Sequence, residues 1–178
     1  MPTSLKAVTH AQNIRYDKAA EALYIIDQSL LPNEEREIRL QTVEEMVEAI
    51  QKLRVRGAPA IGICAAYCLY VLARSIEEPE PAAFQARLRA YSAQLNASRP
   101  TAVNLSWALG EMEKTAALHL EDPRPVFLEA LYEKAVEIHE DDIAKCRAIS
   151  AYGLSLLKDG DGVLTHCNAG PLATSRYG

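Results

Sequence analysis

The sequence has few cysteines, few aromatic side chains and no excess of positive charge. Among 178 residues it has four cysteines: Cys64, Cys68, Cys146 and Cys167. This density is too low for a disulfide-stapled scaffold, so we interpret them as reduced thiols of a cytosolic protein. The i, i+4 pair Cys64 and Cys68 lies in an apolar stretch. Without a second pair it makes no zinc signature, which favours core packing over a shared metal or bond.

Positive charge is scarce as well. Lys and Arg number 19 against 24 Asp and Glu, which gives a net charge of −5. This balance argues against a protein that grips nucleic-acid phosphates over a broad basic face. The aromatic residues, 6% of the chain, are scattered without basic residues between them, unlike those of single-strand binders. A small anionic ligand remains compatible with the charge, because two or three cations in a cleft are enough.

Neither a secretory leader nor a membrane span is expected. The first six residues contain no apolar segment of the kind that signal peptides need. The longest uncharged run lies between Arg56 and Arg74. As a helix it would be about 25 Å long, which is less than the ~30 Å hydrocarbon core of a bilayer. Because the run opens with Gly57, Ala58 and Pro59, we interpret it as a buried core helix.

The first forty residues predict a small β meander. Two β-rich runs, 13–16 and 22–27, flank a polar loop and indicate a hairpin. After a turn at 31–33, residues 36–40 alternate in the way of a third strand.

A helical bundle is expected to follow the meander. Thr42 and Glu45 have the spacing of a capping box, and an apolar stripe runs from there to residue 50. Further helices are predicted to begin near Ala58, to cover 81–95, and to begin at Pro100, since proline is tolerated in a first helical turn.

A proline-rich break at 122–125 is the predicted domain boundary. It divides an amino-terminal β-meander and helical domain, 1–121, from a second region, 122–178. In the second region, 126–157 is predicted to form one long helix or two nearly collinear ones.

The end of the chain predicts the beginning of a different architecture. A polar glycine turn leads into a predicted strand over 163–167, and a further helix is expected from Leu172. Helix, turn, strand and turn make one unit of an α/β sheet. Because one strand cannot make a sheet, we expect these residues to be the front part of a longer protein, with an α/β domain only starting before Gly178.

Three short motifs are candidates for chemistry, and the first covers residues 54–62. It places cations and small residues before a helix start, where free backbone amides and the helix dipole favour an anion. Gly57 and Ala58 would allow a ligand to approach the backbone closely. The alternative is a loop for tight helix packing, with Arg54 and Arg56 in solvent. The residues alone leave both interpretations open.

The second motif covers residues 98–105. Arg99 stands just before a proline helix start, which again puts a cation beside free amides. Taken alone, it is best interpreted as an ordinary surface arginine. Together with the first motif it favours a phosphate pocket, because an arginine fork can grip phosphate oxygens in two places.

The third motif, 164–170, places Cys167 at the carboxyl end of the predicted strand, where α/β sheets bind ligands. A helix start after it would favour the thiolate. The adjacent His166 would point to the opposite face, so no Cys–His pair is implied. The alternative is a buried cysteine that ends a core strand. The acidic stretch 139–142 is interpreted as a solvated helix face rather than a metal site.

Together, these three motifs resemble the methylthioribose-1-phosphate isomerase family, as do residues 173–178 and the opening 23–32. The resemblance extends over essentially the whole chain, in the expected order. That family is related to the regulatory subunits of translation initiation factor 2B and to ribose-1,5-bisphosphate isomerase. The implied fold is an α+β amino-terminal domain that leads into a Rossmann-like α/β domain, cut off here at Gly178.

The implied activity is an aldose–ketose isomerisation in methionine salvage, from 5-methylthioribose 1-phosphate to 5-methylthioribulose 1-phosphate. By motif match, Cys167 is the catalytic residue, while Arg56, Gly57, Ala58 and Arg99 bind the substrate. The resemblance implies no metal and no redox cofactor. Cys167 is assigned to the reacting carbons, either for proton transfer or for stabilising the transition state. An enediol route and a hydride shift both remain open.

The resemblance also implies features that these residues do not contain. The family's catalytic aspartate lies in its carboxyl-terminal domain, so residues 1–178 alone are expected to be inactive. The implied setting is a cytoplasmic homodimer whose partners are a sugar phosphate and that carboxyl-terminal domain, without nucleic acid or membrane. Two alternatives stay open: a ribose-1,5-bisphosphate isomerase, and a non-catalytic regulatory subunit that binds a phosphorylated ligand.

Overall fold

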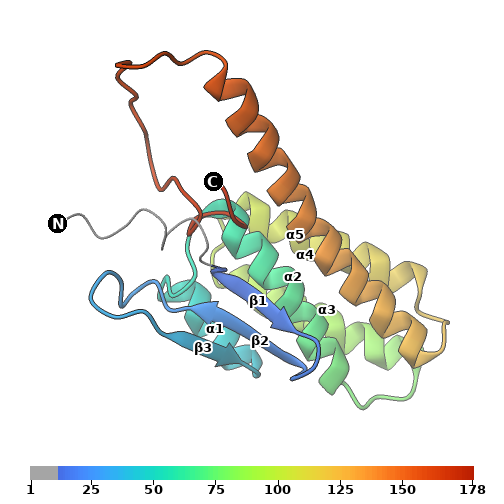
Figure 1. The fold of residues 1–178 in the computed structure, drawn as a ribbon. Helices are drawn as coiled ribbons and strands as arrows, with labels where there is room; N and C mark the ends of the chain where they lie inside the picture. Colours follow the sequence, from blue (N-terminus) through green and yellow to red (C-terminus); the bar gives the residue numbers. More distant parts are fainter. Residues whose placement is uncertain (1–11) are drawn as a thin grey trace.

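The computed structural model describes residues 12–178 and begins with a three-stranded antiparallel sheet (Figure 1). Its strands are β1 (Ile14–Asp17), β2 (Ala22–Ile26) and β3 (Glu37–Leu40), in the spatial order β1-β2-β3. The apolar cross-strand pairs Ile14–Ile25 and Leu23–Leu40 are buried and share one face. The predicted β meander is therefore confirmed.

Five helices follow in the described part of the chain: α1 (Val43–Gln51), α2 (Ala58–Ser75), α3 (Pro81–Ala97), α4 (Val103–Leu118) and α5 (Arg124–Leu154). The predicted capping box is present, because Thr42 accepts from the backbone of Glu45 and Glu45 reaches back to Thr42. The last helix was predicted as one long helix or two nearly collinear ones, and the structure has one long helix, α5. The fourth helix was predicted to begin at Pro100. It begins at Val103, and residues 98–101 form turns before it.

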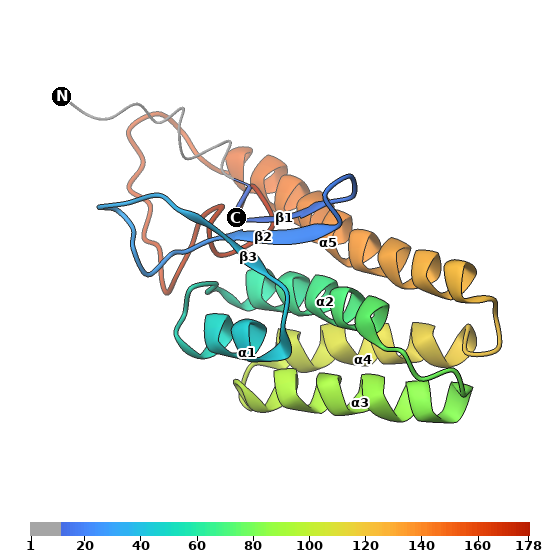
Figure 2. The same cartoon turned by 90° about the horizontal axis from the view of Figure 1, so that it is seen from below.

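The core of the fold is α2, which packs against β1, β2 and the other helices (Figures 1 and 2). It is the one helix in the described residues that is long and apolar enough to cross a membrane, but 72% of that span is buried inside the protein. The predicted core helix is thus confirmed. Small residues let its neighbours approach, since a Cβ at Gly62 would lie 2.8 Å from the carbonyl oxygen of Asn104 in α4.

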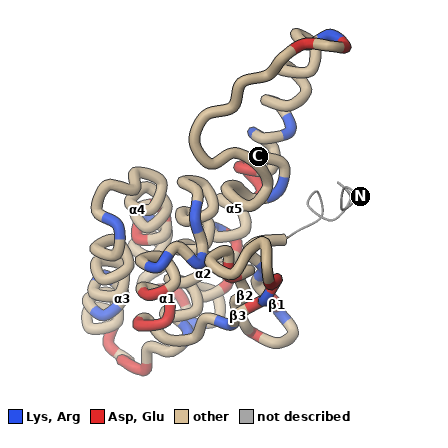
Figure 3. The backbone as a smooth tube through the Cα atoms, turned by 90° about the vertical axis from the view of Figure 1, so that its left-hand side faces the viewer, with Lys and Arg blue, Asp and Glu red and all other residues tan. Residues whose placement is uncertain are grey.

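Most charged side chains are exposed or half-buried, and Asp27 is the buried one in the described residues. Figure 3 shows basic and acidic segments interspersed along the helices and the sheet. The first half of α5 also contributes to the core, where Phe127 and Leu131 are buried with residues of α2 and α4. The boundary between 1–121 and 122–178 stays a prediction.

An aromatic cluster connects β1, α2 and α5. The rings of Tyr16, Tyr67, Tyr70 and Tyr132 lie in contact, and the Tyr67 hydroxyl is 3.2 Å from Nδ1 of His139. Burial lowers the pKa of His139 below its ordinary 6.5, although the charges of nearby acidic groups act in the opposite direction. His139 therefore belongs to the packed interface of α5, and not to the solvated face expected for 139–142.

This pKa shift predicts a loss of stability in acid. As the pH falls below 6.5, the unfolded chain takes up a proton before the folded chain does, so the contribution of neutral His139 to stability is lost. In His139→Gln, we expect the urea midpoint to fall less than in the wild type between about pH 7.5 and about pH 5.5. The exposed His166→Gln is the matched control. Equal acid sensitivity in the wild type and His139→Gln would contradict the assignment.

The segment after α5 differs from the sequence-based prediction. Residues 163–167 are exposed and form no strand, because no other strand of the described chain lies beside them to pair with. From Leu172 the chain forms turns instead of the expected helix. The segment 168–177 returns to the start of α2 (Figure 1). The start of an α/β domain here stays a prediction.

Candidate functional site

Arg54, the first cation of the first motif, belongs to an ion-pair network. Its guanidinium donates to Asp27 at 2.5 Å and to both carboxylate oxygens of Glu48 at 2.7 and 2.8 Å. Burial raises the pKa of Asp27, but hydrogen bonds from Ser29 and Arg54 outweigh it and leave the pKa lowered. Arg54 therefore anchors the loop to the residue after β2 and to α1. It is neither free to bind an anion nor left in solvent, which were the two interpretations of this motif.

Gly57 and the start of α2 lie against the carboxyl-terminal segment. Gly57 has a φ of +103°, and a Cβ built there would lie 2.3 Å from the carbonyl oxygen of Ala173. The same oxygen accepts the backbone N–H of Ala60 at 3.2 Å. The close approach that Gly57 permits is thus occupied by the protein's own chain, and Ala58 beside it is exposed.

Arg56 borders a cavity of about 450 Å³ together with the loop that follows Cys167. Its described walls come from three places in the sequence: Gln28, Ser29, Leu31, Pro32, Arg56, Asn168, Ala169, Pro171 and Leu172. Arg56 supplies the one positive charge among these residues, and most of the remaining wall is apolar. The structure therefore brings the first and third motifs together, although they are more than a hundred positions apart in the chain.

Cys167 stands next to this wall and is exposed, with a φ of +64°. A non-glycine residue in the left-handed region is uncommon, and such residues often mark functional turns. The alternative interpretation, a buried cysteine that ends a core strand, is wrong, since this thiol is open to solvent. The predicted helix after it is also absent from the described residues, so the helix-dipole argument for a thiolate does not apply.

Arg99 is half-buried in the turn between α3 and α4 and does not line this cavity. It lies at the same end of the helical layer as Arg56, because the start of α4 packs against the start of α2 through Gly62 and Asn104 (Figure 2). The structure thus places the second motif at the same end of the helices as the start of α2, but not in the wall of the cavity.

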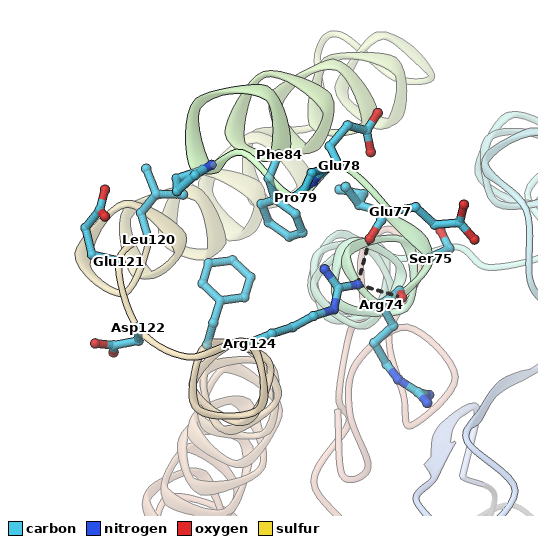
Figure 4. Close-up of a pocket in the computed structure, with 13 residues that line it drawn as sticks. Arg74, Ser75, Glu77, Glu78, Pro79, Phe84, Leu120, Glu121, Asp122 and Arg124 are labelled. Atoms are coloured by element: carbon cyan, nitrogen blue, oxygen red, sulfur yellow. Dashed lines mark hydrogen bonds between the residues drawn. The ribbon is translucent and has the colours of Figure 1, made fainter.

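A larger cavity, of about 550 Å³, lies where α2 ends and contains none of the predicted site residues (Figure 4). Phe84 and Phe127 meet edge to face in it, at 5.0 Å between ring centroids. Arg124 donates to three carbonyl oxygens at the end of α2, those of Ala73, Arg74 and Ile76, at 2.7–3.3 Å. Its cation is therefore engaged in capping a helix, so size alone does not make this cavity the active site.

Within residues 12–178, no three His, Cys, Asp or Glu side chains gather in a way that could hold a metal ion. The Cys64 and Cys68 sulfurs are 3.8 Å apart, and both residues are fully buried in the core of α2. Burial raises the pKa of the Cys68 thiol well above its ordinary value. The interpretation of this pair as small core residues is therefore confirmed.

Three side chains that hold the wall or the segment around it carry no sequence signal. Gln28 lines the cavity, Asn13 donates to the carbonyl of Leu172 at 2.8 Å, and Asp142 accepts the backbone N–H of Ser175 at 2.8 Å. Their partners are backbone groups far away in sequence, and no motif marks such contacts.

Comparison with known proteins identifies the family of the chain. Residues 54–175 match the Initiation factor 2 subunit family, IF-2B, and this is more than half of the chain. The chain therefore belongs to the IF-2B family. It is 51% identical over 165 residues to methylthioribose-1-phosphate isomerase of Symbiobacterium thermophilum, covering 93% of this chain and 46% of the relative. It is 51% identical over 154 residues to 5-deoxyribose 1-phosphate isomerase of Moorella thermoacetica, covering 86% and 44%.

Solved structures agree with these relatives. The fold matches 5-methylthioribose 1-phosphate isomerase from Pyrococcus horikoshii OT3 with a TM-score of 0.87 and 35% identity, over 99% of this chain and 49% of that one. It matches translation initiation factor eIF-2B subunit delta from A. fulgidus with a TM-score of 0.80 and 36% identity, over 92% and 47%. The chain thus spans about half the length of its relatives, and the resemblance stated from the motifs is confirmed.

Proposed function

We propose that the protein is an aldose–ketose isomerase that converts 5-methylthioribose 1-phosphate to 5-methylthioribulose 1-phosphate, as a step of methionine salvage. The observation that supports this most is the cavity in which Arg56 faces the loop after Cys167. Homologues bearing the names of sugar-phosphate isomerases, at about half identity, agree with it. The protein is proposed to act as a cytoplasmic homodimer that needs no nucleic acid, membrane, metal or redox cofactor.

The reaction requires groups of the kind this cavity presents. In the substrate the phosphate blocks the anomeric oxygen, so the ring must be opened before hydrogen moves from C2 to C1. Arg56 is suited to binding the phosphate and the sugar hydroxyls, and Arg99 is proposed to assist. Gly57 and Ala58, which do not line the cavity, are proposed to serve this site by letting the carboxyl-terminal segment dock at the start of α2. Cys167 is proposed to act at the reacting carbons, as a proton-transfer group or as a stabiliser of the transition state.

The resemblance assigns a catalytic aspartate to a carboxyl-terminal domain, and no aspartate of residues 1–178 is proposed for that role. Residues 1–178 alone are therefore expected to show no turnover. Turnover is therefore to be measured with the complete gene product, which includes that carboxyl-terminal domain.

The walls of the cavity favour a substrate with one phosphate. Leu31, Pro32, Pro171 and Leu172 form an apolar side, while Arg56 provides a single cation. An uncharged C5 substituent, methylthio or hydrogen, suits such a wall, whereas a second phosphate would find no second cation among these residues. A second candidate is therefore 5-deoxyribose 1-phosphate, the substrate that the name of the Moorella relative contains. Ribose 1,5-bisphosphate fits this wall less well.

We expect the complete gene product to turn over the two sugar monophosphates and to act poorly on ribose 1,5-bisphosphate under identical conditions. In Arg56→Ala and in Arg99→Ala, substrate binding should weaken by roughly 1.5–3 kcal/mol, the range for a charged hydrogen bond. The measurements are kcat and KM for each sugar. Arg89→Ala, on the exposed face of α3, is the control. Preference for the bisphosphate, or unchanged binding in Arg56→Ala, would contradict the proposal.

A further inference from the structure

Gln28 makes two contacts that join separate parts of the candidate site. It follows β2 and is 7% exposed. Its backbone N–H donates to the carbonyl of Arg54 at 2.8 Å, two positions before Arg56. Its side-chain Nε2 donates to the carbonyl of Leu172 at 2.8 Å, five positions after Cys167. One buried residue therefore connects the Arg56 loop with the segment that follows the thiol.

Asn13 supports the same segment from the sheet. It is fully buried, and its Nδ2 donates to the carbonyls of Leu172 at 2.8 Å and Thr174 at 2.9 Å. Its own carbonyl accepts the N–H of Ile26 in β2 at 3.0 Å, which fixes it to the sheet. The Leu172 carbonyl thus accepts from two buried amides, one on each side of the hairpin.

These bonds decide where the segment lies, because it has no regular secondary structure of its own. Two further anchors come from the helices: the N–H of Ala60 donates to Ala173, and the N–H of Ser175 donates to Asp142. Those two bonds hold the segment at Ala173 and Ser175, after Leu172. The Gln28 contact is the one made at the cavity wall itself, since Gln28, Leu172 and Arg56 all line it.

We propose that Gln28, supported by Asn13, is a positioning residue for the isomerisation. It holds the wall segment that follows Cys167 in place relative to Arg56, and so sets where the thiol stands at the edge of the cavity. It acts through the Leu172 carbonyl rather than on the substrate. The inference rests on the proposed function. Catalysis depends steeply on such placement, since a misplacement of about 1 Å can cost about a hundredfold in rate.

The test replaces Gln28 by methionine, which keeps the side-chain length and removes the donor, in the complete gene product. Gln94→Met on the exposed face of α3 is the matched control. We expect kcat of Gln28→Met to fall about ten- to hundredfold while KM changes little, because the groups that bind phosphate remain. Amide hydrogen exchange of residues 168–177 should become faster, with the exchange of β2 and of α2 beyond Ala60 unchanged.

Asn13→Asp serves as a second variant, because a carboxylate cannot donate to Leu172 and Thr174. Its exchange should accelerate in the same segment. The proposal is overturned if the segment exchanges at the wild-type rate in both variants, or if kcat of a folded Gln28→Met equals that of Gln94→Met. An inactive wild type would overturn the proposed function and the catalytic role with it. An active wild type with an unaffected Gln28→Met would overturn the positioning role alone.

Discussion

Cys167→Ala is expected to lower kcat of the complete gene product by about 10²–10⁴-fold, the range that a positioned proton-transfer group contributes. The fold should be unchanged, because Cys167 is exposed and is not one of the buried core residues. The measurements are kcat with 5-methylthioribose 1-phosphate and the thermal unfolding midpoint. His166→Ala, at the exposed neighbouring position, is the control and should retain activity.

Alkylation provides a second readout of the same residue. The other three cysteines are buried, so iodoacetamide should react first with Cys167, and substrate should slow the reaction. The Cys167→Ala variant should lose this fast-reacting thiol together with its activity. Wild-type turnover in Cys167→Ala, or alkylation that destroys no activity, would contradict the catalytic assignment.

The parts of the fold that were predicted correctly depend on local signals. The capping box at Thr42 and Glu45, and the alternation of residues 36–40, are decided within a few residues of each other. The predicted strand over 163–167 failed for the opposite reason. A strand is stable only beside a partner, and no partner is present in the described chain.

Of the predicted site residues, Arg56 lines the cavity, whereas Gly57, Ala58, Arg99 and Cys167 do not. The cation-and-glycine pattern of the first motif marked Arg56, which lines the cavity, but equally marked Arg54, which is neutralised by Asp27 and Glu48. Both arginines precede the same helix start, so only the distant carboxylates distinguish them. Likewise, Gln28 donates to a carbonyl 144 positions away. Because the acceptor is a backbone carbonyl, which every residue has, the residue type at position 172 does not reveal the contact.

Gly57 is the position where sequence and structure give different reasons for the same residue. The motif suggests that glycine lets a ligand approach, whereas the structure shows the backbone of Ala173 in that space. Any Cβ at position 57 would overlap this backbone, and a φ of +103° strains a residue with a side chain. The replacement of Gly57 therefore acts on the docking of the whole carboxyl-terminal segment.

We accordingly expect Gly57→Ala to destabilise the protein by roughly 1–3 kcal/mol and to lower kcat/KM, since the segment after Cys167 would leave its place beside Arg56. Gly110→Ala in α4 is a matched control with the opposite sign. Nothing lies within 4 Å of a Cβ there, so the helix should gain about 0.5–1 kcal/mol. Urea unfolding and kinetics of both variants measure the difference. If Gly57→Ala were as stable and as active as Gly110→Ala, the carboxyl-terminal segment would not be docked at the start of α2, and the cavity that Arg56 shares with it would not form.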